Sequence, residues 1–206
     1  MITTAFLLTA LVVCLAPGTG VVYTLSVALG RGFGPALAAV VGCTLGIVPH
    51  LLAAVLGLAA VLHASALAFQ VVKFAGVAFL LWMAWKTLRE TGAMTGIEGE
   101  RAGTPAVAVA VRGALINVLN PKLSVFFLAF LPQFTDPAAG GMTGQMLLLG
   151  GVFMVLTAAV FTLYALFAAA ARRRVLGNAR AMAWIRRSFA AAFGLLAVRL
   201  AMQGRD

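Results

Sequence analysis

The sequence predicts an all-α membrane protein with six transmembrane helices, arranged as two inverted three-helix repeats. Of its 206 residues 63% are hydrophobic and only 10% are charged, against roughly 25% charged in an ordinary globular chain. The hydrophobic residues gather in six runs, each near the ~20 residues that cross a bilayer. Three runs lie on each side of a polar, glycine-containing segment, and an odd number of spans per half gives the two halves opposite topology.

The six runs follow one another through short connections. The first has no basic residue before it and continues past the length of a signal-peptide core, so we expect it to be retained as a helix. Only three residues separate the second run from the third, which predicts a tight antiparallel hairpin. Arg186, Arg187 and Arg199 interrupt the sixth run near its ends. The runs cover residues 3–27, 36–62, 66–88, 113–134, 146–171 and 184–202.

The chain is expected to form a single polytopic membrane domain, 1–206. Repeat 1 covers about residues 1–90, a cytoplasmic loop residues 91–112, and repeat 2 about residues 113–206. Most Lys and Arg side chains fall in the connections on one side, which should be cytoplasmic, in the inner (plasma) membrane. Both termini are then periplasmic. The eleven basic residues on that side are Arg31, Lys86, Arg89, Arg101, Arg112, Arg172, Arg173, Arg174, Arg180, Arg186 and Arg187.

The charge and the cysteines exclude several other classes. A net charge of +10 would suggest a nucleic-acid partner in a soluble protein, but here cytoplasmic anchoring explains it. Cys14 and Cys43 lie in apolar runs without metal-ligand spacing, which argues against a disulfide scaffold or a zinc site. We therefore expect no nucleic acid, no metal and no cofactor. Gly42 and Gly46 form a G-x-x-x-G pair, which suits helix contacts within one chain or a homo-oligomer.

Lys122 is the residue that says most about function. It is the tenth of 22 residues in the run 113–134, near the bilayer centre, where a lysine costs about 2.5–3.5 kcal/mol on insertion scales. It follows Asn120 and Pro121, and the proline frees the backbone carbonyl one turn earlier, at Asn117. Asn117 and Asn120 share a helix face. We expect these residues to bind substrate; the alternative is a lysine whose side chain extends to the interface.

The first run contains a matching interruption. Pro17, Gly18, Thr19 and Gly20 weaken the helix and expose backbone groups, which lipid does not tolerate. Paired Gly/Pro breaks in corresponding helices of two halves indicate a site at the repeat interface. We therefore add Pro17, Gly18 and Thr19 to the predicted substrate site, with a simple helix kink as the alternative.

His50 and the acidic residues indicate whether a proton could be carried and which charge the transported solute could have. His50 lies in the second run and is the candidate proton carrier, because histidine exchanges protons near neutral pH. The alternative is a packed histidine that binds a neighbouring carbonyl. All five acids lie outside the six runs, so a purely cationic solute has no counter-charge there. They are Glu90, Glu98, Glu100, Asp136 and Asp206.

These features together resemble the LysE/RhtB family of bacterial amino-acid exporters over nearly the whole chain. The resemblance is carried by the Pro17-Gly18 break, by the Gly42/Gly46 helix that ends near His50, and by Lys86 with Arg89. Its most specific parts are residues 117–122 (NVLNPK) and 127–134 (FLAFLPQF). In the family the first-helix pattern usually reads Pro-Gly-Pro followed by Asn or Asp, whereas this chain has Thr19 and Gly20. The resemblance implies a six-helix inner-membrane carrier that exports amino acids by proton exchange.

The predicted function is that of a secondary active transporter that exports amino acids, with neutral ones such as homoserine or threonine preferred to basic ones. It would work by alternating access around a midplane pocket, and it would not be an enzyme. Two other classes remain open. A membrane thiol oxidoreductase would need cysteines in matched helices of the two halves, and a non-transporting scaffold subunit would need no midplane lysine.

Overall fold

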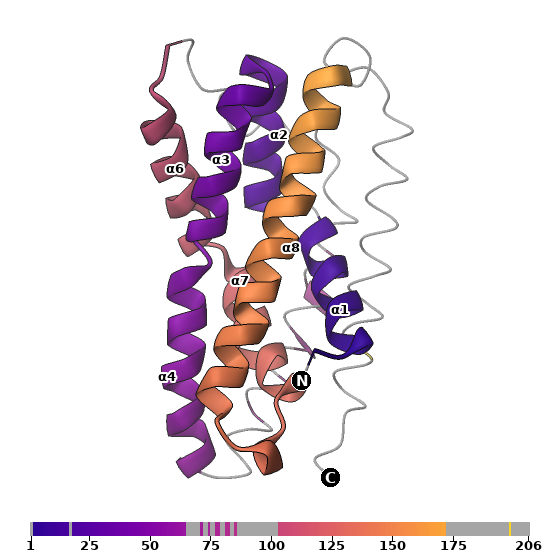
Figure 1. Ribbon diagram of the computed structural model, residues 1–206, viewed down its shortest axis with the longest axis vertical. Helices are drawn as coiled ribbons and strands as arrows, with labels where there is room; N and C mark the ends of the chain where they lie inside the picture. The colour runs from indigo at the N-terminus through magenta and orange to yellow at the C-terminus, as the bar shows by residue number, and fades with distance from the viewer. Residues whose placement is uncertain are drawn as a thin grey trace.

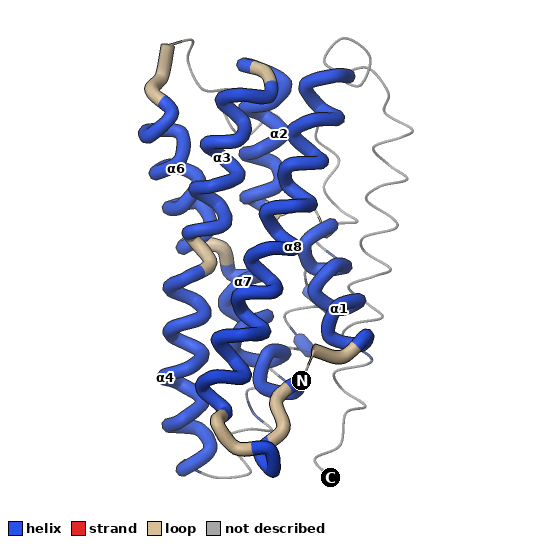
Figure 2. Tube along the Cα trace, in the orientation of Figure 1, coloured by secondary structure: helices blue, strands red, loops and turns tan. Residues whose placement is uncertain are grey.

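The computed structural model describes residues 2–16, 18–64 and 103–171, together with the single positions 71, 74, 77, 78, 81, 82, 85 and 198. In this part of the chain every regular element is helical, as predicted (Figures 1 and 2). Apart from those single positions, the predicted third and sixth runs lie outside the described residues, and so do most of the predicted cytoplasmic loop and Pro17. The six-helix count and the inverted repeats therefore remain predictions.

The first predicted run folds as two helices. Helix α1 (Thr4–Leu15) begins where the Thr3 hydroxyl accepts a hydrogen bond from the Phe6 amide at 3.1 Å, which is an ordinary N-cap. It ends before Ala16, whose backbone is extended, as expected of a residue that precedes a proline. Helix α2 (Thr19–Arg31) then continues at an angle of more than 40° to α1. The two helices together are long and apolar enough for one bent span.

The second predicted run also contains two helices, α3 (Phe33–Leu45) and α4 (Val48–Ala64). The chain turns from α2 into α3 at Gly32, whose φ of +90° is a conformation that glycine adopts easily. Residues Phe33–Gly57 are long and apolar enough to cross a membrane without a large bend. The interruption between α3 and α4, at residues 46–47, was not predicted.

The fourth predicted run begins earlier than expected. Helix α6 (Ala106–Val118) starts just after Pro105, seven residues before the predicted start at residue 113 and inside the predicted loop 91–112. The prediction was wrong because it ended the loop at Arg112, whereas an arginine near a membrane end can keep its charged group in water. Arg112 is exposed on α6.

The chain breaks again after α6. Helix α7 (Pro121–Val125) follows, then a π-helical turn η1 (Phe126–Phe130) and a 3₁₀ turn η2 (Leu131–Phe134). This segment is bent by 52° relative to α6, and the two form one more candidate span. Proline at the first position of α7 explains the break, because its missing amide cannot continue the ladder of α6.

The fifth predicted run is a single long helix, α8 (Met142–Ala171), which starts four residues earlier than the predicted run. A short 3₁₀ turn, η3 (Pro137–Ala139), precedes it. Gln145 secures this connection, since its side-chain amide donates to the carbonyls of Asp136 at 2.9 Å and Gly140 at 2.7 Å. With α8, the described residues hold two unbent candidate spans, or four if each bent pair is counted as one.

Helices α3 and α6 pack with their backbones nearly in contact, and they lie side by side in Figures 1 and 2. A Cβ added to Gly42 would overlap the carbonyl group of Ala110, and one added to Gly46 would lie 2.5 Å from the Ala114 carbonyl oxygen. The predicted G-x-x-x-G pair thus packs against another helix of the same chain.

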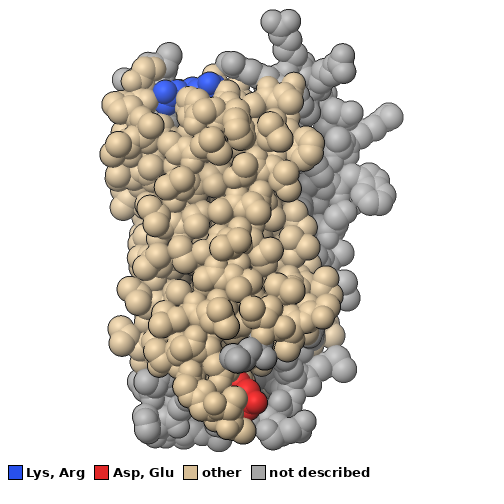
Figure 3. All heavy atoms as spheres, in the orientation of Figure 1, with Lys and Arg blue, Asp and Glu red and all other residues tan. Residues whose placement is uncertain are grey.

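In the part of the chain that the structure describes, the two ends of the molecule differ in charge. Figure 3 shows basic side chains at one end of the face that it draws, acidic atoms at the other end, and uncharged described surface between them. Among the described residues, Arg31 ends α2 and Asp136 follows η2. Large apolar side chains are exposed along the helices, including Leu56 and Leu119, which are 74% and 79% exposed. This apolar surface suits lipid, and the orientation of the molecule in the membrane stays a prediction.

Candidate functional site

Three interrupted helices meet halfway along the molecule. The gaps between α1 and α2, α3 and α4, and α6 and α7 all fall near the middle of the long axis (Figure 1). A helix that ends leaves its last carbonyls without intrahelical partners, and inside a membrane those groups need protein partners. The middle of the bundle therefore gathers polar backbone groups from three directions.

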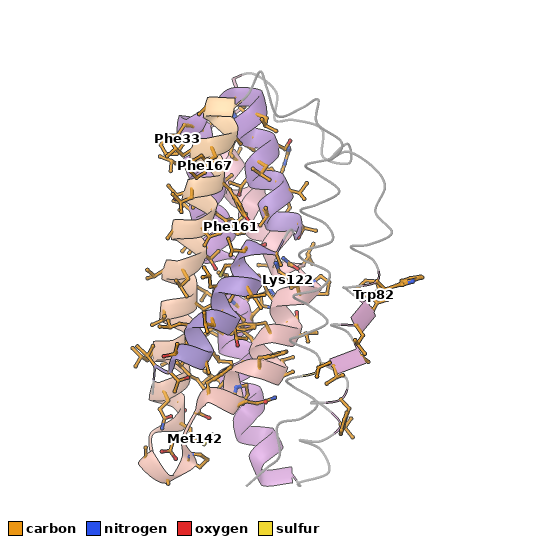
Figure 4. The ribbon with its side chains drawn as sticks, turned by 90° about the vertical axis from the view of Figure 1, so that its right-hand side faces the viewer. Phe33, Trp82, Lys122, Met142, Phe161 and Phe167 are labelled. Atoms are coloured by element: carbon orange, nitrogen blue, oxygen red, sulfur yellow. The ribbon has the colours of Figure 1, made fainter. Side chains whose placement is uncertain are left out.

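Lys122 supplies the hydrogen-bond donor for the carbonyls at the gap between α1 and α2. Its ammonium nitrogen, Nζ, donates to the carbonyl oxygens of Val13 and Ala16, at 3.0 Å each. Val13 belongs to the last turn of α1, and Ala16 is the residue that caps its end. The side chain is only 6% exposed and lies well inside the bundle (Figure 4). It does not extend to a membrane interface, which was the alternative that the sequence left open.

Two buried asparagines continue the polar contacts into the second half of the chain. Asn120 accepts the Lys122 backbone amide through Oδ1 at 3.1 Å, and so caps α7. Its side-chain nitrogen donates to Asn117 Oδ1 at 3.3 Å. Asn117 in turn donates to the Cys43 carbonyl at the end of α3, at 2.7 Å. The side chains predicted from the NVLNPK segment thus form one network between α3 and α7.

The glycines of the first break face this network. A Cβ on Gly18 would lie 3.0 Å from Lys122 Nζ, and one on Gly20 would lie 2.5 Å from Asn117 Oδ1. The two Gly/Pro breaks are therefore in contact, as the paired pattern predicts. Thr19 and Pro121 do not take part through their side chains: both are exposed, and neither lines the cavity described next.

A small cavity lies beside the Lys122 ammonium. Its volume of about 10 Å³ leaves room for about one water molecule. An amino acid does not fit into this space unless the helices move apart. The described residues that line it are Val13, Cys14, Gly20, Val21, Asn117, Asn120, Lys122, Leu123, Phe153, Thr157 and Phe161.

Sequence analysis missed the contribution of α8 to this cavity. Thr157 is buried in the middle of α8, donates to the Phe153 carbonyl at 2.9 Å, and lies 3.2 Å from the Cys14 sulfur. Phe153 and Phe161 form the apolar part of the wall. The sequence did not single it out, because α8 contains three threonines, Thr143, Thr157 and Thr162, and a threonine in any of these places could contact another helix in a membrane.

His50 lies next to the network rather than in the cavity. One ring nitrogen, Nε2, is 2.8 Å from the Asn117 carbonyl oxygen, and the other is 3.2 Å from the Ser124 hydroxyl. Because a carbonyl can only accept, Nε2 carries the hydrogen. The ring is thus packed against a neighbouring carbonyl, the one that Pro121 frees, and whether it also carries a proton stays a prediction. In the described part of the chain no three His, Cys, Asp or Glu side chains form a group that could hold a metal.

Comparison with known proteins identifies a family. The chain matches the family described as LysE type translocator over residues 11–204, which include every residue of the cavity. A relative from Vibrio cholerae, described as an uncharacterized membrane protein, is 36% identical over 165 residues, 80% of each chain. A homoserine/homoserine lactone efflux protein of Salmonella typhimurium is 32% identical over 167 residues, 80% of this chain and 79% of that one.

A leucine efflux protein of Klebsiella pneumoniae is 26% identical over 131 residues, 64% of this chain and 62% of that one. No solved structure matches the chain. The family match covers nearly the full length and confirms the resemblance that the NVLNPK and FLAFLPQF segments carry. The chain belongs to the LysE type translocator family.

Proposed function

We propose that the protein is a secondary active transporter that exports amino acids across the bacterial inner membrane. The observation that carries the proposal is a buried ammonium, that of Lys122, bonded to the free carbonyls of a broken helix midway through an apolar bundle. Charges at that depth are costly and usually mark a substrate or ion pathway. Membership of a translocator family, and relatives named for homoserine and leucine efflux, support the same reading.

The site has a partner for each part of an amino acid. Lys122 receives the carboxylate, and Asn117 and Asn120 supply amide contacts. The carbonyls of Val13 and Ala16, at the first break, receive the ammonium, because the Asn117 carbonyl at the second break already accepts from His50. The apolar wall accepts an aliphatic side chain, and the Thr157 hydroxyl accepts or donates to a polar one. The described lining contains no acidic residue, so we propose neutral amino acids rather than lysine or arginine as substrates.

Transport proceeds by alternating access, with the small cavity as the occluded form between an inward-open and an outward-open state. The protein exchanges a proton for the amino acid, and His50 is the proposed proton carrier. Its ring bonds the backbone of Asn117, whose side chain lines the cavity, so a change in the charge of His50 acts on a substrate-binding residue. The basic end of the molecule, near Arg31, faces the cytoplasm.

An export assay tests the proposal. The protein is expressed in a bacterial strain that lacks its own amino-acid exporters, and cells are loaded with homoserine, threonine, leucine or lysine. Efflux of at least one neutral amino acid is expected to rise severalfold over cells with an empty vector, while lysine efflux stays at the control rate. Robust lysine efflux without neutral efflux would contradict the substrate preference.

The same assay separates the proposal from the thiol oxidoreductase that the sequence left open. Cys14 and Cys43 are both free and buried. A variant with both cysteines replaced by alanine is expected to keep its export activity, because neither thiol has a chemical step in the carrier mechanism. Loss of export in this variant, with normal protein in the membrane, would favour the redox alternative.

A further inference from the structure

The carbonyl pair at the end of α1 is a cation site that the protein fills with its own side chain. Both oxygens accept from Lys122 Nζ at 3.0 Å, and both belong to the end of a helix, where the partial charge is negative. An ammonium has three donors, so one remains for the cavity side. Any primary ammonium of similar size offers the same donors to this carbonyl pair.

The contact joins the two halves of the chain. Lys122 is in α7, more than a hundred residues from Val13 and Ala16 along the sequence. Separately, the end of α1 is tied to α8, because the Tyr164 hydroxyl donates to the Leu15 carbonyl at 2.7 Å and Cys14 contacts Thr157. The end of α1 therefore keeps its bonds to α8 when its bonds to Lys122 are broken.

Releasing Lys122 without a replacement is costly. It would leave a buried ammonium and two buried carbonyls unpaired, and such groups carry the full penalty of their lost hydration. The contact therefore keeps the cavity small until a ligand provides both an anion for the Lys122 ammonium and a hydrogen-bond donor for the two carbonyls. We call the Lys122 contact with Val13 and Ala16 the α1 latch.

We propose that a zwitterionic amino acid opens the α1 latch by exchange. Its ammonium takes the Val13 and Ala16 carbonyls from Lys122, and its carboxylate receives the released Lys122 ammonium. Every buried charge is paired before and after the exchange. A solute without an ammonium leaves the carbonyls unpaired, and one without a carboxylate places two ammonium groups together. The identity of the ligand rests on the proposed function, whereas the existence of the latch does not.

The native cysteine beside the latch reports its state. Cys14 lines the cavity and is 2% exposed, and replacing Cys43 by alanine leaves it as the single cysteine of the chain. In this background, N-ethylmaleimide labelling of Cys14 is measured on protein in lipid vesicles without amino acid. Lys122→Met is expected to raise the labelling rate about tenfold, which is the net effect of losing a hydrogen bond to a charged group.

A second variant keeps the charge. Gly18→Ala places a methyl group 3.0 Å from Lys122 Nζ, so the ammonium must shift by a few tenths of an ångström, which weakens its bonds to the two carbonyls. Labelling of Cys14 is expected to rise here too, by a smaller factor. The reverse background, with Cys14 replaced by alanine and Cys43 kept, measures general loosening, because Cys43 is fully buried in α3. Unchanged Cys14 labelling in both variants, or an equal rise at Cys43, would overturn the latch.

Ligands test the exchange on the single-cysteine parent. Leucine is expected to raise Cys14 labelling, whereas N-acetyl-leucine, which lacks the ammonium, and leucinamide, which lacks the carboxylate, leave it unchanged. If N-acetyl-leucine or leucinamide acts as strongly as leucine, the exchange is wrong. If the variants open the latch but leucine, homoserine and threonine all fail to do so, the latch stands and the proposed substrate class fails.

Discussion

Replacing Lys122 with methionine is expected to abolish amino-acid export while the protein still accumulates in the membrane. The substitution removes the only described cation in the cavity lining, and with it the group that binds the substrate carboxylate. Methionine has a similar length and no charge, so insertion into the membrane becomes easier rather than harder. The measurement is the efflux rate of a neutral amino acid per amount of membrane protein, which should fall to that of an empty vector.

The neighbouring residue offers a matched control. Leu123 is also buried in α7 and lines the same cavity, and Leu123→Met conserves its volume and apolar character. We expect its export rate to remain within about twofold of the parent, since volume-conserving apolar changes cost little. Export by Lys122→Met at the parental rate would contradict a substrate role for the lysine and leave it a structural role only.

The second large effect is on folding rather than transport. Gly42→Val is expected to prevent the close packing of α3 and α6, because even a Cβ at this position would overlap the Ala110 carbonyl group. The obstacle is backbone, which cannot rotate away as a side chain can. We expect a loss of more than about 3 kcal/mol, beyond the usual range for an overpacked core, and little folded protein after extraction from membranes.

Gly34 provides the control on the same helix. Gly34 has open space around the position of a Cβ and is exposed, so Gly34→Val should accumulate and unfold like the parent. The comparison uses size-exclusion chromatography of the detergent-extracted proteins, followed by thermal unfolding of whatever is recovered. Equal recovery and equal unfolding temperature for the Gly42 and Gly34 variants would show that α3 and α6 do not depend on this contact.

The helix breaks and their meeting point could be predicted because they follow from local chemistry. Pro17 and Pro121 cannot continue a helix, and a lysine at mid-membrane depth needs partners, so the two features point to one another. The structure confirms that Gly18, Asn117 and Lys122 come together.

Which side chains enter the site could not be predicted. After a break, the 3.6-residue period no longer fixes the rotation of the next helix, so sequence spacing did not show that Gly20 rather than Thr19 faces Asn117. The contribution of Thr157 depends on how α8 packs against α1, which is a tertiary contact with no local signature. For the same reason the sequence predicted exposed backbone groups around Pro17, but not that Lys122 would bind the Val13 and Ala16 carbonyls.

The central claim is that amino acids cross the membrane through this protein, and flux through the purified protein in liposomes tests it most directly. Liposomes with the protein and protein-free liposomes are loaded with labelled leucine or homoserine, and a proton gradient is imposed. We predict saturable efflux that requires the protein and accelerates with the gradient. Efflux equal to that of protein-free liposomes for every neutral amino acid, from protein that remains folded, would contradict the account.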